Sequence, residues 1–192
     1  MAENFDLVVI GSGPGGYVAA IRAAQLGMKT AVVEKAEPGG VCLNWGCIPT
    51  KALLHSATLY NHIKHAQDFG VQVTGASVDL AKMVKHSRTT AQRLSKGIEF
   101  LFRKNNITVV AGKGKIVDKG KVEVESADGK KQMLACKHIL IATGARPRTI
   151  PGFDLDGKQI ISSREAMIPE QIPSSLLIIG AGAIGVEFAY FY

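Results

Sequence analysis

A glycine-rich turn near the start of the chain constrains its fold more than any other feature. The run FDLVVI at 5–10 is mainly apolar and predicts a strand buried in a parallel sheet. The turn GSGPGG at 11–16 follows at once, and an alanine-rich stretch at 17–26 predicts a helix. A second strand is expected at 30–33, directly before Glu34. These elements form a complete βαβ unit, so we expect an α/β fold.

The glycines of this turn fit the binding of a dinucleotide. Gly11 permits the tight turn, Gly13 lets the backbone approach a pyrophosphate, and Gly16 lets the helix pack closely on the strand. Glu34 lies where an acidic residue receives the hydroxyl groups of a ribose. A glycine-rich turn in an unrelated α/β fold is the alternative, but strand, helix and acid all agree with a nucleotide site.

A close pair of cysteines comes directly afterwards. Cys42 and Cys47 follow two glycines and precede Pro49-Thr50-Lys51. A disulfide between them would close a small ring and stabilise little through loop entropy, so redox chemistry is its expected use. The apolar run at 52–63 predicts a helix, which places the pair near a helix N-terminus where the dipole and Lys51 favour a thiolate.

Other readings of the cysteines are weaker. Two buried free cysteines or half a zinc site would also fit the spacing, but the sequence holds no second close pair to complete a zinc site. Cys136 is expected to be structural. Cys42 follows a flexible glycine-rich approach, so we assign it to the substrate, and Cys47, next to the helix, is held more rigidly.

The middle of the chain predicts one long helix and several strands. The helix is expected at 79–105, after an irregular stretch at 71–78, and a strand follows at 107–110. The apolar positions of the predicted helix at 79–105 follow three- and four-residue spacing: Leu80, Met83, Val84, Ala91, Leu94, Ile98 and Leu101. Residues 115–134 predict a small β-meander with a hairpin turn at Asp128-Gly129, and 138–142 predict a further buried strand.

A second glycine turn lies near Tyr192. The turn GAGAIG at 180–185 follows an apolar strand pattern at 176–179 and precedes the start of a helix. We divide the chain into a nucleotide-binding domain at 1–147, a proline-containing linker at 148–173 and the start of a second such domain at 174–192. Because no second strand or ribose-binding acid follows, the expectation is a piece of a longer polypeptide.

Composition excludes several classes of function. With 46% hydrophobic and 20% charged residues, the chain is typical of a soluble globular protein. The net charge of +7 comes from dispersed lysines without a nucleic-acid motif, so we expect no nucleic-acid partner. The sequence has no apolar run long enough to span a membrane and no recognisable signal peptide. We therefore expect a cytoplasmic protein. His62 and His65 lack nearby carboxylates, so no metal site is expected.

Taken together, these features resemble the pyridine nucleotide–disulfide oxidoreductases. The resemblance covers all 192 residues and only the N-terminal part of that family's chain. It rests on both glycine turns and on the runs CLNWGCIPTKALL at 42–54, GIEFLF at 97–102, GKGKI at 112–116 and ATGA at 142–145. The match is closest to members that oxidise dihydrolipoyl groups; glutathione and mercuric reductases share the cysteine spacing, but their flanking residues fit less well.

The sequence departs from the family pattern at three places. Trp45 stands where a small apolar residue is common, Val41 replaces the usual threonine, and the segment at 34–42 is one residue short.

The resemblance implies FAD on the first turn and NAD on the second. Cys47 would face the flavin and Cys42 would exchange with the substrate, while Lys51 and Glu187 would meet as an ion pair near the flavin ring. The implied FAD residues are Gly11, Gly13, Gly16, Glu34, Lys35, Gly40, Cys42, Lys51, Gly114, Thr143, Gly144 and Ala145. The implied NAD residues are Gly180, Gly182, Gly185 and Glu187.

The implied activity belongs to a longer, homodimeric flavoprotein. Electrons would pass from dihydrolipoyl groups of a 2-oxoacid dehydrogenase complex to the cysteine pair, then to FAD and NAD. The family's catalytic base and the strand that closes its flavin domain are missing from these 192 residues, so the chain alone is expected to be inactive. The alternatives are an inactive truncated product and a related disulfide or mercuric reductase.

Overall fold

The computed structural model describes residues 3–148 and 150–192, which group into two compact units. The first unit comprises the described residues of Met1–Asn44 and Gln92–Arg146. The second comprises those of Trp45–Ala91 and Pro147–Tyr192. Residues 1–2 of the predicted nucleotide-binding domain and residue 149 of the predicted linker lie outside the described residues, and the predicted domain boundaries stay predictions.

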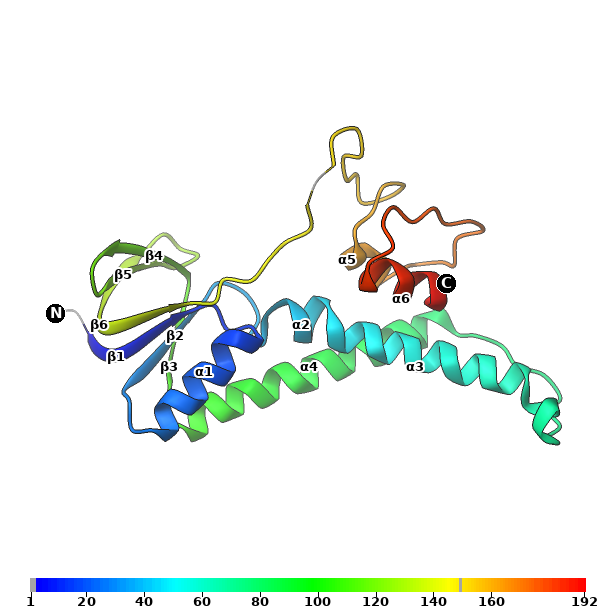
Figure 1. Cartoon of the computed structure of the whole chain (residues 1–192), viewed down its shortest axis with the longest axis horizontal. Coiled ribbons are helices and arrows are strands. Elements are labelled where there is room, and N and C mark those ends of the chain that lie inside the picture. Colours follow the sequence, from blue (N-terminus) through cyan, green and yellow to red (C-terminus); the bar gives the residue numbers. More distant parts are fainter. Residues whose placement is uncertain (1–2, 149) are drawn as a thin grey trace. The chain divides into compact units, whose positions relative to one another are not determined.

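The first unit is built on one six-stranded sheet in the order β3-β2-β1-β6-β5-β4 (Figure 1). Its strands are β1 (Glu3–Ile10), β2 (Thr30–Glu34), β3 (Thr108–Ala111), β4 (Lys113–Asp118), β5 (Lys121–Glu125) and β6 (Lys131–Ile141). Strands β3, β2, β1 and β6 pair in parallel, whereas β6, β5 and β4 pair antiparallel. A Rossmann-like sheet with an attached meander is therefore confirmed.

Strand β6 belongs to both halves of the sheet. Leu134 pairs with Val122 of the meander and with Glu3 of the parallel half. The sequence analysis predicted two separate segments here, at 115–134 and 138–142. The pattern of residues does not show that one continuous strand changes its neighbours along its length. The expectation that 138–142 is fully buried is wrong: His138 is exposed and Ile141 is 65% exposed. Beyond Ala135 the described strand pairs with β1 alone. Ile139 packs against the core cluster, whereas His138 and Ile141 remain exposed.

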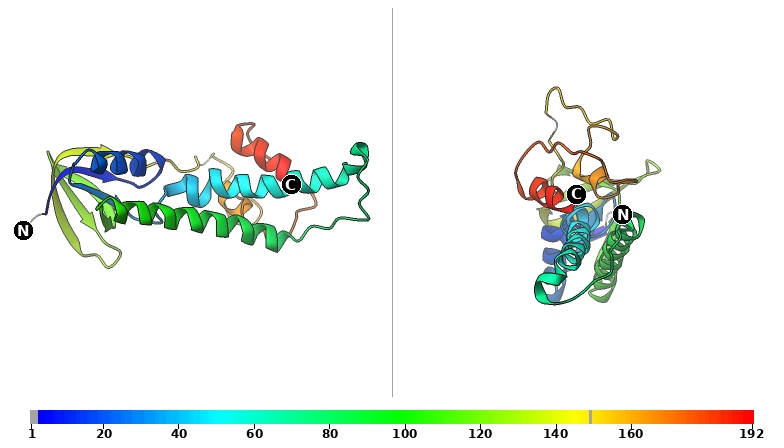
Figure 2. Two further views of the ribbon diagram at one scale, coloured as in Figure 1. Left: turned by 90° about the horizontal axis from the view of Figure 1, so that it is seen from below. Right: turned by 90° about the vertical axis from the view of Figure 1, so that its right-hand side faces the viewer.

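The core of the first unit explains why β1 is continuously apolar. Val8 and Val9 point to opposite faces of the sheet, and both are 0% exposed. Helix α1 (Pro14–Gln25) packs along the sheet (Figure 2). The hydrophobic core cluster of this unit consists of Phe5, Val8, Ile10, Ala31, Val33, Val110, Val122, Val124 and Leu134.

Two glycines let α1 lie directly against the end of β1. A Cβ on Gly16 would stand 1.9 Å from the carbonyl oxygen of Gly11. Gly11 has φ +98°, and a Cβ there would stand 2.3 Å from the carbonyl oxygen of Ala142. Gly13, the N-cap of α1, has φ −66° and open space where its Cβ would be. The first and last glycines are therefore required for packing, and the middle one is not.

The second unit is mainly helical. It holds α3 (Cys47–Lys64), the 3-10 helix η1 (Ala66–Phe69), α5 (Ser163–Ala166) and α6 (Ala183–Phe191). Helices α2 (Gly40–Trp45) and α4 (Leu80–Lys104) each cross the division between the units. The core of the second unit consists of Leu53, Ala166, Met167 and Phe188.

The segment at 148–173 is more ordered than a plain linker. It contains α5, whose capping box joins Ser162 and Glu165, and Met167 just after it is only 2% exposed. The hydroxyl of Ser162 lowers the pKa of the Glu165 carboxyl by donating a hydrogen bond to it. The sequence analysis did not predict this short helix, because the prolines of the segment were typical of a linker.

The strand expected at 176–179 is absent from the described residues. Leu177 is 87% exposed, and no neighbouring strand is available in the described part of the second unit to pair with this segment. A strand needs such a neighbour to satisfy its backbone hydrogen bonds.

The prediction of one long helix is confirmed by α4, but its buried face differs from the predicted one. The buried positions are Ser87, Ala91, Ser95, Ile98 and Phe102. Leu94, predicted to be buried, is 36% exposed. Two serines take places where a hydrophobic pattern would put apolar residues. Residues 71–78 have no regular structure, as expected. Among all the described helices, none combines the length and hydropathy needed to cross a membrane.

We predict that Gly16→Ala destabilises the protein by about 1–3 kcal/mol, because α1 must move away from β1 to admit the methyl group. Gly13→Ala should unfold like the wild type, because its φ suits alanine and its Cβ meets no atom. Urea unfolding of the two variants gives the comparison. Equal stabilities would contradict the inferred close approach of α1 to Gly11.

Candidate functional site

The ends of three parallel strands meet at one edge of the sheet. The amide of Gly11 donates to the carbonyl of Val33 at 2.8 Å, and the amide of Ala142 donates to the carbonyl of Ile10 at 2.8 Å. Through these bonds the first glycine turn, the end of β2 and the start of 142–145 are brought together. Open parallel sheets bind ligands outside the carboxyl ends of their strands.

The Glu34 carboxylate is fixed against the first glycine turn. One oxygen, Oε2, accepts hydrogen bonds from the backbone amide of Ser12 at 2.8 Å and from its hydroxyl at 2.6 Å. The other, Oε1, accepts from the amide of Ala36 at 2.9 Å. Ser12 is fully buried. The sequence analysis singled out Glu34 but missed Ser12, whose only signal is a hydroxyl within the glycine turn.

The segment that leads to Cys42 lies on the same turn. The amide of Gly39 donates to the carbonyl of Ser12 at 3.1 Å. Gly40 has φ +62°, and a Cβ there would stand 2.6 Å from the Cα of Gly13. The segment before Cys42 therefore contacts the glycine turn directly, which its position in the chain did not predict.

The two cysteines form a disulfide. Cys47 is the first residue of α3, with Gly46 as its N-cap, so the prediction of a helix N-terminus is confirmed. Cys42, which follows the glycine pair as the sequence has it, lies within the short helix α2, which was not predicted. The side chain of Asn44 stabilises α2, since its Nδ2 donates to the carbonyls of Pro38 and Gly40, each at 3.0 Å. Cys47 is exposed and Cys42 is half-buried, and their separate roles stay predictions.

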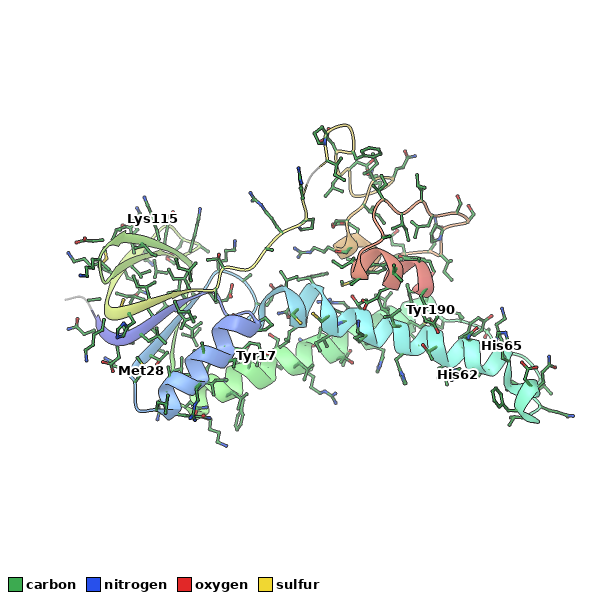
Figure 3. All side chains as sticks on the ribbon, viewed as in Figure 1. Tyr17, Met28, His62, His65, Lys115 and Tyr190 are labelled. Atoms are coloured by element: carbon green, nitrogen blue, oxygen red, sulfur yellow. The ribbon has the colours of Figure 1, made fainter. Side chains whose placement is uncertain are left out.

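Lys51 and Glu187 form the predicted ion pair. The Nζ of Lys51 donates to Oε1 of Glu187, which joins α3 to α6. Tyr190 is labelled on α6 in Figure 3. Its hydroxyl is hydrogen-bonded to the hydroxyl of Thr58 on α3 at 3.1 Å, which joins the same two helices. Glu187 compensates the charge of Lys51 in this pair. The expected support of Lys51 for a thiolate at Cys47 stays a prediction. Its position near a flavin stays a prediction.

The two buried serines of α4 contact the cysteine segment. The hydroxyl of Ser87 donates to the carbonyl of Pro49 at 3.0 Å, and that of Ser95 donates to the carbonyl of Pro38 at 2.6 Å. These hydrogen bonds explain why serine stands on the buried face of the helix. The sequence analysis missed both residues, because a serine in an amphipathic helix usually lies on the solvated face.

The second glycine turn repeats the backbone of the first. Gly180 has φ +109°, and a Cβ on Gly185 would stand 2.2 Å from the Gly180 carbonyl oxygen. Gly182 is the N-cap of α6 with φ −74° and ψ 176°, close to the −66° and −177° of Gly13. A Cβ on Gly182 would meet no atom. The turn geometry is thus present even though the strand before it is not.

The remaining predicted cofactor residues have simpler surroundings. Gly114 packs on β1 and β2, since its Cβ would lie 3.1 Å from Ile10 Cγ2 and 3.2 Å from Val33 Cγ1, so packing alone explains this glycine. Other positions lie on the surface: Lys35, Thr143, Gly144 and Ala145. Their contacts with FAD stay predictions.

The other candidate groups play no part in this site. Burial raises the pKa of the Cys136 thiol, which favours the protonated, unreactive form. His62 lies on α3 and His65 is the C-cap residue of that helix (Figure 3). The described residues contain no group of three or more His, Cys, Asp or Glu side chains able to hold a metal ion.

Comparisons with known proteins agree with this arrangement. Residues 5–192 match the family model described as pyridine nucleotide-disulphide oxidoreductase. The chain is 53% identical over its whole length to a dihydrolipoyl dehydrogenase of Chlorobaculum tepidum, of which it covers 41%. Over 98% of its length it is 45% identical to the Bacillus subtilis protein of the same name, of which it covers 42%. Over 97% it is 48% identical to the mitochondrial one of Pisum sativum, of which it covers 38%.

The chain therefore spans about two fifths of the length of these relatives. The family match extends over both glycine turns and the cysteine pair, the features that define the candidate site. The chain belongs to the pyridine nucleotide-disulphide oxidoreductase family.

Proposed function

We propose that this chain is the N-terminal part of a flavoprotein that oxidises dihydrolipoyl groups of a 2-oxoacid dehydrogenase complex, with NAD as the final acceptor. The observation that carries the proposal is the Cys42–Cys47 disulfide at the start of α3, on a segment bonded to a dinucleotide turn. The relatives named dihydrolipoyl dehydrogenase support the choice of substrate. A dimer is expected for the longer protein from the same resemblance.

The residues present fit FAD on the first turn. Gly13 leaves its backbone open at the N-terminus of the 12-residue helix α1, where unpaired amides and the helix dipole favour a pyrophosphate. The Glu34 carboxylate lies against the same turn and suits ribose hydroxyls. When bound, FAD would accept two electrons from the dithiol and pass them to NAD.

The cysteines themselves would perform a thiol–disulfide exchange. A substrate thiolate attacks the Sγ of Cys42, the Cys42–Cys47 bond breaks, and Cys47 leaves as a thiolate. The second substrate thiolate then attacks the sulfur bound to Cys42, which closes the lipoyl disulfide and releases the Cys42 thiolate. Two electrons pass from the substrate to the protein in this way. The N-terminus of α3 favours Cys47 as the leaving group, because the helix dipole stabilises negative charge there.

The second turn would contribute to the NAD site through Gly180, Gly182 and Gly185, with Glu187 nearby on α6. Its support is the backbone geometry that it shares with the first turn. A reductase for a different disulfide, or for a metal ion, would use the same cysteines, so a substrate assay of the full-length protein decides between them. Oxidation of dihydrolipoamide with NAD, and not of NADPH with glutathione disulfide or mercuric ion, is the expected result.

We predict that Glu34→Ala weakens FAD binding by about 1.5–3 kcal/mol, the usual worth of a hydrogen bond to a charged group. Titration of the FAD-free, full-length protein with FAD measures this. Glu37→Ala is the matched control, because it removes an equal charge at an exposed position three residues later. If Glu34→Ala and Glu37→Ala bind FAD equally well, the ribose assignment of Glu34 fails.

We predict that Cys42→Ser and Cys47→Ser both abolish dihydrolipoamide oxidation in the full-length protein, since each removes one sulfur of the exchanging disulfide. The two variants should differ in the visible spectrum. A Cys47 thiolate beside the flavin gives a long-wavelength absorbance, so Cys42→Ser should keep this band and Cys47→Ser should lose it. A band that survives only in Cys47→Ser would reverse the two roles.

A further inference from the structure

Trp45 lies within the ring closed by the cysteines and contacts two arginines. The guanidinium carbons of Arg88 and Arg164 each lie over the indole ring, 4.0 Å from its centroid. The indole Nε1 is buried and has no hydrogen-bond partner in the described part of the chain. The tryptophan is therefore held through its ring rather than through its polar atom, and this geometry suits cation–π attraction.

Both arginines project from anchored backbone. Arg88 follows Ser87 on α4, and the buried Ser87 hydroxyl donates to the carbonyl of Pro49. Arg164 belongs to α5, whose N-terminus is closed by the capping box of Ser162 and Glu165. Two elements distant in sequence thus place a cation on the same side chain. We call Trp45, Arg88 and Arg164 the Trp45 cluster.

The neighbours of Trp45 within the ring are anchored as well. Leu43 is 6% exposed, and Asn44 donates hydrogen bonds to two carbonyls. The carbonyl of Gly46 accepts from the hydroxyl of Thr50 at 2.7 Å. None of these contacts involves sulfur, so breaking the disulfide bond removes none of them directly.

We propose that the Trp45 cluster positions the dithiol, holding the segment between Cys42 and Cys47 in its closed-ring geometry after reduction. Arg88 and Arg164 act through Trp45 and are positioning residues. The inference rests on the proposed redox function of this cysteine pair and adds which residues set its reduction potential. It also gives a role to the tryptophan that distinguishes this segment from the common family pattern.

The expected consequence is a stronger tendency to re-form the disulfide. Thiols held close together have a high effective concentration toward each other, which favours closure of the ring. In exchange with dithiothreitol, the Cys42–Cys47 bond breaks, dithiothreitol closes its own disulfide, and two electrons and two protons pass to the protein. A loosened segment lets the reduced thiols separate, which shifts this equilibrium toward the reduced protein.

The test measures this equilibrium in the full-length holoenzyme. The wild type, Trp45→Ala, Trp45→Phe and Arg164→Gln are equilibrated without oxygen at set ratios of reduced to oxidised dithiothreitol, quenched with acid and alkylated. Peptide mass spectrometry then gives the fraction of Cys42–Cys47 disulfide. Trp45→Ala should favour the reduced form about tenfold, a potential about 30 mV less negative. Arg164→Gln should favour the reduced form about threefold. The equilibrium of Trp45→Phe should lie between those of the wild type and Trp45→Ala.

Arg93→Gln, an exposed arginine on the same helix α4, is the matched control and should leave the equilibrium unchanged. Arg164 is exposed, so its variant is expected to fold even if Trp45→Ala does not. Unchanged equilibria in Trp45→Ala and Arg164→Gln, with or without a loss of thermal stability, would overturn the proposal. A more negative potential in Arg164→Gln would also overturn it, because it would show that the arginine acts by stabilising thiolate charge.

The outcome is independent of the substrate assignment. If the wild type fails to oxidise dihydrolipoamide, the proposed function fails, while the dithiothreitol equilibrium still reports on the Trp45 cluster. If the wild type oxidises dihydrolipoamide and the variants keep its potential, only the inference about the Trp45 cluster fails.

Discussion

The close contact between the first turn of α1 and the end of β1 is the constraint on which the site depends. Gly16 has to lack a side chain because its Cα faces the Gly11 carbonyl oxygen, 1.9 Å from where a Cβ would be. This contact fixes the N-terminus of α1 at the edge of the sheet. Ser12, held in the same turn, then reaches the Glu34 carboxylate and the amide of Gly39. The nucleotide turn and the approach to Cys42 are thus one bonded unit of structure.

Polar contacts to backbone carbonyls, more than apolar packing, shape the cysteine segment. The carbonyl of Pro38 accepts from both Asn44 and Ser95, and that of Pro49 accepts from Ser87. Proline cannot donate a backbone hydrogen bond, yet its carbonyl remains a full acceptor. Such directional bonds specify the path of a short segment that contains a break between two helices more narrowly than hydrophobic contact does. A redox-active disulfide needs this, because its surroundings must remain in place while its own bond opens and closes.

The sequence was most informative where structure follows from local sterics or from chain order. The glycine turn with Glu34 beside it, a helix N-terminus near the cysteine pair and the pairing of Lys51 with Glu187 were predicted and are present, although α3 begins at Cys47 and not at residue 52. The features that were missed depend on contacts between distant residues. Hydrophobic periodicity pointed correctly to Ala91 and Ile98 on α4 but also to the exposed Leu94. It missed the buried Ser87 and Ser95. Neither the helix α5 nor its arginine over Trp45 had any periodic signal.

The two glycine turns show which structure is determined locally and which depends on distant residues. At 180–185 the backbone adopts the conformation of the first turn, with Gly182 matching Gly13 as N-cap and Gly185 facing the Gly180 carbonyl. Yet the residues before it, unlike those of β1, form no strand. A glycine turn needs only the freedom of its own dihedral angles and one close backbone contact, whereas a strand needs a partner for its hydrogen bonds. The conformation of the glycine turn is therefore encoded within a few residues, whereas a strand beside it depends on the neighbours that are available to pair with it.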